Sequence, residues 1–301
     1  MTTMPSPLNR RDTLRLFSLP ALSGVLGLPA TAALAQAPAR PPRIVSVNGA
    51  MTEIVYALGA EKQLVGTDTT SLFPAAALQT AKVGYMRQLS AEGLLSLKPD
   101  AVIGTTEAGP GVVMDQVRSA GVKVELVEAD HSWGEVQRKV AAVWRATSRV
   151  AQANALQAKL DAEWAGVLAA VAASKGGRKP RAIFILSHSS SAQVSGDKTA
   201  AHAMMVFAGL QNALAGSFSA YRPMTAESIV TAAPDVIVTT VQGIEASGGL
   251  EKFWARPGLE MTPAYRRRAV VALDALYLIG FGPRLPQAVT ELHQAAWKVT
   301  A

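Results

Sequence analysis

Residues 89–106 read LSAEGLLSLKPDAVIGTT and residues 224–240 read MTAESIVTAAPDVIVTT, so the chain contains nearly the same pattern twice. In each copy a hydroxyl residue that can cap a helix, Ser90 or Thr225, precedes a short helical stretch, and a Pro-Asp turn leads into an apolar strand. The two copies are separated by far more than the roughly 20–50 residues of a solenoid repeat. The repeat therefore predicts two similar α/β lobes with a cleft between them.

Strand and helix signals alternate along the rest of the chain, which is typical of parallel sheets covered by helices. The first half predicts strands over 43–47, 64–66, 101–104 and 122–127 and helices over 50–58 and 111–119. The second half predicts strands over 181–186 and 269–273, helices over 199–208 and 285–298, a glycine-containing loop around 243–249 and a tight turn over 280–284. Between the halves, apolar residues recur at three- and four-residue steps, which predicts one long helix over 148–174.

The predicted fold class is therefore α/β, with two similar lobes of parallel sheet flanked by helices and joined by one long rigid α-helix. The lobes are expected over 43–147 and 178–301, on either side of the helix over 148–174. A stiff helix between the lobes predicts that they move little relative to each other.

The first 35 residues have the pattern of an export signal. Three arginines precede an apolar stretch over 16–34, and Ala33-Leu34-Ala35 has the small-x-small form of a signal-peptidase site. Two prolines within the stretch shorten it below the roughly 20 residues that a membrane anchor needs. The run Asn9-Arg10-Arg11-Asp12-Thr13-Leu14 also resembles a twin-arginine export signal, and the residues alone leave the export route open. We expect residues 1–35 to be a signal peptide cleaved near Ala35 and the mature protein to lie in the periplasm.

The composition excludes several classes of function. The formal net charge is +7, but the 29 basic residues are dispersed, so nothing indicates nucleic-acid binding. The chain has no cysteine, which excludes disulfides, thiolate metal sites, thiol catalysis and an acylated N-terminal cysteine.

The motifs of common enzyme and metal sites are missing together. No Gly-x-Ser-x-Gly turn surrounds Ser189, no glycine-rich nucleotide motif follows the first strand, and the four histidines lack metal-ligand spacing. We therefore expect no catalytic residues and no bare-metal site. A secreted α/β hydrolase that uses Ser189 and His188 is the alternative from the class of enzymes.

Tyr85 lies in a glycine-containing loop directly before the helix of the first repeat. The positive end of a helix and the neighbouring Arg87 both favour an anion at this place. A phenolate oxygen is a hard donor for ferric iron, and tyrosine is an axial haem ligand in proteins. The alternative is an ordinary tyrosine with a buried ring and a solvated hydroxyl.

The segment Val83-Gly84-Tyr85-Met86-Arg87-Gln88-Leu89-Ser90-Ala91-Glu92-Gly93 resembles the signature of haem-binding periplasmic proteins of ABC importers. The turn Gly282-Pro283-Arg284-Leu285-Pro286 and the segment over 257–264 are similar to the same family. This resemblance covers the mature chain from about Arg43, and its general two-lobed pattern is shared with siderophore and cobalamin binders. It implies that Tyr85 ligates ferric haem b, held between the lobes as a transported ligand.

Other positions carry over from the resemblance residue by residue. His188 follows the first strand of the second lobe and either ligates a second haem or bonds the serine-rich loop; the residues leave both open. Gln242 stands in the loop where many relatives carry an arginine beside the tyrosine oxygen. It is expected to donate a hydrogen bond there but not a charge, which leaves Arg87 to stabilise the phenolate. Tyr221 and Arg222 precede the second repeat and are expected to face the cleft and contact the macrocycle or its propionates.

Glu53, on the first helix, resembles the acidic residue by which such proteins dock onto permease arginines; the alternative is a solvated helix-face charge. The resemblance thus implies a periplasmic carrier, not an enzyme, that delivers haem to an inner-membrane ABC permease, with an outer-membrane haem receptor system as a further partner. A ferric-siderophore or cobalamin binder is the alternative within this class.

Overall fold

The computed structural model describes residues 40–174, 178–188 and 191–300, with the side chain of His188 left aside. The expected signal peptide over 1–35 lies outside the described residues. Within the described part, no helix combines the length and the apolar character needed to cross a membrane.

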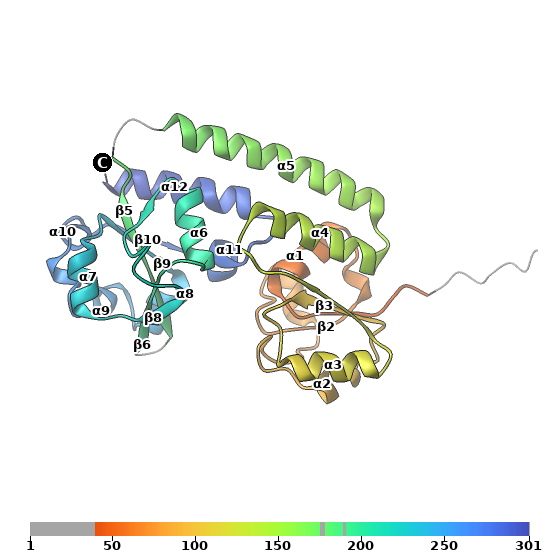
Figure 1. Cartoon of the computed structure of the whole chain (residues 1–301). Helices are drawn as coiled ribbons and strands as arrows, with labels where there is room; N and C mark the ends of the chain where they lie inside the picture. The colour runs from red at the N-terminus through yellow and green to blue at the C-terminus, as the bar shows by residue number, and fades with distance from the viewer. Residues whose placement is uncertain (1–39, 175–177, 189–190, 301) are drawn as a thin grey trace, which may run out of the picture. The chain divides into compact units, whose positions relative to one another are not determined.

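The N-terminal lobe, in which Figure 1 labels β2 and β3, contains a parallel sheet in the order β2-β1-β3-β4. Its strands are β1 (Ile44–Ser46), β2 (Leu64–Thr67), β3 (Ala101–Thr105) and β4 (Lys123–Val127). Its helices are α1 (Gly49–Ala57), α2 (Ala91–Leu95), α3 (Gly111–Ser119) and α4 (Trp133–Thr147), with short 3₁₀ turns over Glu61–Gln63 and Ala75–Gln79. All five residues of β3 are buried, as expected for a central parallel strand covered on both faces.

The C-terminal lobe contains a mixed sheet in the order β10-β9-β5-β6-β8, with β7 paired to β5. Its strands are β5 (Arg181–His188), β6 (Ser191–Ser195), β7 (Gln211–Asn212), β8 (Tyr221–Pro223), β9 (Val236–Thr240) and β10 (Val270–Leu273). Its helices are α6 (Ala200–Phe207), α7 (Ala226–Ala232), α8 (Val241–Ala246), α9 (Leu250–Trp254), α10 (Pro263–Arg267), α11 (Ala275–Ile279) and α12 (Leu285–Thr300), with a 3₁₀ turn over Leu259–Met261.

The predicted fold class is confirmed, with one difference in the second sheet. Strands β5, β9 and β10 are parallel, but β6 runs antiparallel to β5 and β8 antiparallel to β6. The polar residues between β5 and α6 gave no alternating apolar pattern, so the sequence did not reveal β6. Strand β8, which follows α6, has only three residues, too few to show such a pattern. The glycine-containing stretch around 243–249 is also not a simple loop, since α8 occupies most of it and α9 follows.

The long helix predicted between the halves is α5 (Val150–Ala173), with 24 residues. It begins two residues later than expected, because Ser148 takes a left-handed conformation and ends α4. Leu160, Trp164 and Val167 are buried on the predicted face, and α5 packs against α4 and α12. Helix α4 itself was missed by the sequence analysis.

The largest hydrophobic core is continuous between the lobes. It contains Met51 and Val140 from α1 and α4, and Phe184 and Val289 from β5 and α12. Two smaller cores lie within the single lobes. The lobes are therefore joined by shared packing as well as by α5.

Candidate ligand-binding site

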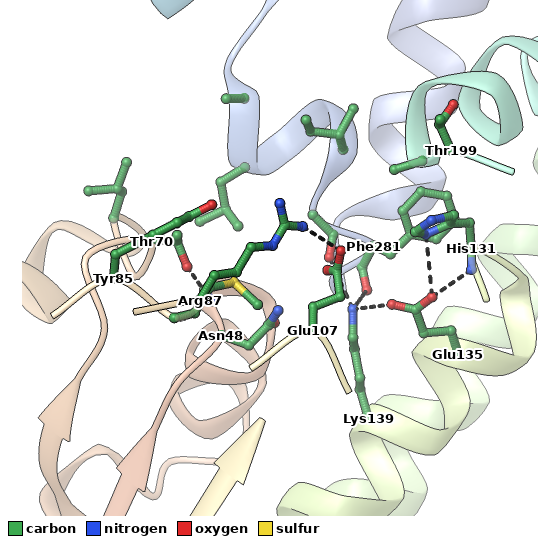
Figure 2. Close-up of a pocket in the computed structure, with 18 of the residues that line it drawn as sticks. Asn48, Thr70, Tyr85, Arg87, Glu107, His131, Glu135, Lys139, Thr199 and Phe281 are labelled. Carbon is green, nitrogen blue, oxygen red and sulfur yellow. Dashed lines mark hydrogen bonds and ion pairs between the residues drawn. The ribbon is translucent and has the colours of Figure 1, made fainter. Parts of the chain in front are cut away.

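A cavity of about 500 Å³ lies between the lobes (Figure 2). This volume lies within the range of about 300–1,000 Å³ that is typical of small-molecule sites. Residues of both lobes line it: Asn48, Gly49, Thr69, Thr70, Leu72, Tyr85, Met86, Arg87, Glu107, His131, Glu135 and Lys139 from the first, and Lys198, Thr199, Ala200, Ala220, Tyr221, Ala275, Leu276, Ile279, Gly280 and Phe281 from the second.

The loop that carries Tyr85 is fixed by its backbone. Gly84 has φ +104°, a conformation that side chains disfavour, and its carbonyl accepts a bond from Thr69 N–H at 2.9 Å. The Tyr85 carbonyl accepts from Gln88 N–H at 2.8 Å, which closes a tight turn. The ring is 40% exposed and lines the cavity. The phenol of Tyr85 is therefore accessible from the cavity, on a loop that backbone hydrogen bonds fix.

Arg87 lines the cavity on the same loop and pairs with Glu107, as Figure 2 shows. Burial acts against the charged guanidinium, but the carboxylate of Glu107 and the nearby phenols of Tyr85 and Tyr221 outweigh it and raise the pKa of Arg87. Arg87 is therefore a permanent cation beside Tyr85. Glu107, which the sequence analysis did not single out, already neutralises part of that charge.

Tyr221 lines the cavity from strand β8 of the second lobe. Burial raises the pKa of its phenol to about 12, although the Ala201 N–H and the Thr199 hydroxyl bond to it. Arg222 is exposed and stacks over the Phe218 ring at 5.0 Å, and it does not line the cavity. The expectation that both residues face the cleft is therefore wrong for Arg222, because successive side chains of a strand point to opposite faces.

Gln242 also lies outside the cavity lining. Its amide donates to Asp274 Oδ2 at 2.7 Å and accepts from Ala275 N–H at 3.0 Å, so both ends of the side chain are engaged. It fixes the start of α11, which forms part of the cavity wall, and the expected bond to the tyrosine oxygen is not present. The backbone of His188 ends β5 and pairs with Ser191, and its side chain lies outside the described atoms.

Glu53 is neither a solvated helix-face charge nor a free docking group. It is 5% exposed, and both of its oxygens accept from Arg284 at 2.7 Å. Glu53 lies on the first helix, as the sequence predicted, but it is buried because α1 packs against the C-terminal lobe as well as on its own sheet.

His131, Glu135 and Lys139 form a cluster in the cavity lining that was not predicted from the sequence (Figure 2). Lys139 Nζ lies 2.6 Å from Glu135 Oε1, and the backbone N–H of His131 donates to Glu135 Oε2 at 2.7 Å. Full burial lowers the pKa of Lys139 against the opposing effect of Glu135. The four-residue spacing of Glu135 and Lys139, which places them on one face of α4, was the available signal for this pair, whereas His131 precedes the helix.

Among the described residues, no group of three or more His, Cys, Asp or Glu side chains is arranged to hold a bare metal ion. The polar groups that line the cavity are instead spread along walls formed by Leu72, Met86, Leu276, Ile279 and Phe281. Such a lining suits a large, partly apolar ligand that carries a few polar groups.

Known proteins with similar sequences and structures are binding proteins. The periplasmic heme-binding protein BhuT, solved in complex with two hemes, is 43% identical with a TM-score of 0.82, and the match covers 86% of this chain and 99% of that one. The heme-binding protein RhuT from Roseiflexus sp. RS-1 is 37% identical with a TM-score of 0.82, over 87% and 100% of the two chains.

Among sequence relatives, the uncharacterized ABC transporter substrate-binding lipoprotein YvrC of Bacillus subtilis is 30% identical over 86% of this chain and 81% of its own length. A cobalamin-binding protein of Halobacterium salinarum is 26% identical over 86% of this chain and 70% of its own. A family model described as periplasmic binding protein matches residues 44–277. The fold, the cavity between the lobes and this match agree: the chain belongs to the periplasmic binding protein family.

Proposed function

We propose that this protein binds ferric haem b between its two lobes in the periplasm and delivers it to an inner-membrane ABC permease. The observation that carries the proposal is the exposed Tyr85 phenol at a cavity of about 500 Å³ with apolar walls. The likeness to BhuT and RhuT, which are heme-binding proteins, supports it.

In this proposal Tyr85 ligates the iron through its oxygen, and Arg87 stabilises the phenolate form through its charge. The apolar walls bury the porphyrin faces, at roughly 25 cal/mol per Å² of apolar surface. Lys198 lines the cavity on the opposite lobe and offers, with Arg87, a cation for the propionates. Of the two roles that the residues leave open for His188, the complex of BhuT with two hemes supports the ligation of a second haem.

The experiment that tests the proposal is a hemin titration of wild type and Tyr85→Phe, followed by absorption spectroscopy. We expect wild type to develop a Soret band and tyrosinate-to-iron charge-transfer bands, and Tyr85→Phe to lose the latter and to bind about 10–100-fold more weakly, as for loss of a strong directed contact. Tyr56→Phe is the matched control, since Tyr56 lies on α1 outside the cavity lining. An unchanged spectrum and affinity in Tyr85→Phe would contradict the ligand assignment.

A cobalamin or ferric-siderophore binder is the second candidate, favoured by the cobalamin-binding relative. Competition separates the two: a protein that binds cyanocobalamin or a ferric chelate more tightly than hemin belongs to the second class. The carrier role, rather than catalysis, rests on the family and on these relatives.

Because Glu53 is buried, we propose that two other acidic residues, Glu92 and Glu227, dock onto the permease. Glu92 and Glu227 occupy equivalent positions in the two copies of the repeat, in the first turn of α2 and of α7, and both are exposed. One exposed carboxylate on each lobe suits a permease that presents one basic pocket per subunit, and opposite charges steer such an encounter.

We expect Glu92→Ala/Glu227→Ala to bind hemin like wild type but to lose most haem-dependent stimulation of the permease ATPase in proteoliposomes. Glu260→Ala, an exposed acid on the second lobe outside the repeat, is the control. Equal stimulation by the double variant and the control would remove the two acids from the docking surface.

Export to the periplasm, cleavage near Ala35 and the supply of haem by an outer-membrane receptor system belong to the same proposal. N-terminal sequencing of the protein recovered from a periplasmic extract tests the first two. A mature terminus at Gln36 is the expected result.

A further inference from the structure

Loop Gly280–Arg284, between α11 and α12 of the C-terminal lobe, is held mainly by residues of the N-terminal lobe. Gly280 and Phe281 form part of the cavity wall. Phe281 is 1% exposed and has φ +52°, a left-handed conformation that a bulky residue adopts only when its surroundings hold it there.

Lys139 on α4 makes the first set of contacts that fix the loop. Its ammonium group has three N–H donors, and it donates to the carbonyls of Gly280 and Phe281 at 3.1 Å each, while Glu135 accepts the third at 2.6 Å. Lys139 is 1% exposed, so no water competes for these bonds. The Lys139 ammonium group thus binds the left-handed backbone of the loop to the N-terminal lobe.

Arg284, at the other end of the loop, makes the second set of contacts. Its guanidinium bonds both oxygens of Glu53 on α1 at 2.7 Å, the paired geometry that arginine and carboxylate favour. The same group lies 3.9 Å from the ring centroid of Phe73, a second N-terminal residue, and 5.0 Å from that of Tyr277. A cation over an aromatic face adds attraction when it is shielded from water.

Between these two sets of contacts, the loop backbone at Gly282 packs directly against α1. A methyl group added at Gly282 would lie 3.1 Å from the Ala50 side chain, so glycine allows this close approach. The Phe281 ring contacts His131 of the first lobe at 5.4 Å and Phe207 of the second at 6.4 Å between centroids. One buried cation, one half-buried cation and one buried ring therefore act across the same lobe boundary.

We propose that the Gly280–Arg284 loop is a second connection between the lobes, independent of α5, and that Lys139 and the Glu53–Arg284 pair are positioning residues that hold it as the closed inner wall of the cavity. In this view α5 alone does not fix the lobes. The cavity keeps its shape because the loop ties α1 and α4 to the C-terminal lobe. The inference rests on the proposed function only for its haem readout.

The test uses the absence of native cysteine, which allows site-specific labelling. Spin labels at Gln116→Cys and Glu260→Cys, both exposed and on different lobes, report the interlobe distance by pulsed EPR in the protein without haem. The variants are Glu53→Gln/Arg284→Gln and Glu135→Gln/Lys139→Met. Each removes both charges of a pair, because an unpaired buried charge would itself destabilise the fold. Arg145→Gln, which breaks an exposed ion pair with Glu125 inside the N-terminal lobe, is the matched control.

We expect one narrow distance distribution in wild type and in Arg145→Gln, and a broader one shifted to longer distances in each double variant.

Hemin dissociation into excess apomyoglobin should be about tenfold faster in the double variants, because such changes act mostly on the dissociation rate. Distance distributions in both double variants that match wild type would overturn the inference and leave α5 as a sufficient connection. If wild type binds no hemin, the proposed function fails, while the distance measurement still decides the connection. Far-ultraviolet circular dichroism checks folding, and the second double variant keeps the test valid should one not fold.

Discussion

Tyr85 and Tyr221 line one cavity in different surroundings. Tyr85 lies on a loop, is 40% exposed and stands beside the cation Arg87. Tyr221 lies on a strand, is half-buried beside the Phe184 ring, and has a pKa raised by burial to about 12. A phenol with that pKa keeps its proton between about pH 5 and 9, so Tyr221 is not suited to act as an anionic ligand.

This contrast gives a prediction at the residue scale. Tyr221→Phe should leave the tyrosinate-to-iron bands of the haem complex unchanged at any pH from about 5 to 9, because the phenol is neutral there. Affinity should fall by no more than about tenfold, since the change removes only the neutral hydroxyl that bonds Ala201 and Thr199. Hemin titrations of Tyr221→Phe and Tyr85→Phe at several pH values provide the check. Loss of the bands in Tyr221→Phe would reverse the two assignments.

At the scale of single elements, both copies of the sequence repeat begin with the same structural feature, a hydroxyl side chain that caps the N-terminus of a short helix. Ser90 Oγ accepts from Gly93 N–H at 3.1 Å, and Thr225 Oγ1 accepts from Ser228 N–H at 3.2 Å. Helices of five and seven residues are too short to be stable alone. Their caps and the strands behind them must therefore fix α2 and α7.

We accordingly expect Ser90→Ala and Thr225→Ala each to lower the free energy of unfolding by about 1 kcal/mol, the usual value of a lost cap. Chemical denaturation followed by circular dichroism measures this. Ser119→Ala is the control, because this exposed hydroxyl lies at the end of α3 and bonds only the preceding turn. Equal stability of the cap variants and the control would mean that packing alone starts these helices.

At the scale of the whole molecule, the buried pair of Glu53 and Arg284 links α1 to the C-terminal lobe. Desolvation of the carboxylate outweighs its bonds with Arg284 and raises the pKa of Glu53 above 4.5. Burial also acts against the charged guanidinium of Arg284, but its hydrogen bonds with Glu53 and the nearby negative charges together outweigh burial and raise the pKa of Arg284. The folded protein therefore binds a proton at Glu53 more readily than the unfolded chain does.

The sign of the pH dependence follows from this raised pKa. The contribution of Glu53 to stability is fully present below its unfolded pKa of 4.5 and is lost as the pH rises through its folded pKa. The difference in unfolding free energy, wild type minus Glu53→Gln, should therefore decrease as the pH rises from about 4 to 7. Urea denaturation of both proteins across this range measures it, with the exposed Glu92→Gln as the control. A difference that grows with pH would contradict the raised pKa.

The sequence by itself determined what depends on local order. The repeated cap, Pro-Asp turn and apolar strand predicted α2–β3 and α7–β9, because capping and turn chemistry act over a few residues. The apolar steps of α5 and the glycine loop around Tyr85 were readable for the same reason. These local signals sufficed for the α/β fold class and for the main candidate ligand residue.

Only the tertiary structure decided which of the predicted polar residues meet. Arg222 stacks on Phe218 outside the cavity lining, and Gln242 donates a hydrogen bond to Asp274. Glu53 is buried against a partner 231 residues away in sequence. Such pairs form because two distant elements pack together and a buried charge must then find its counter-charge, a requirement that no local pattern records.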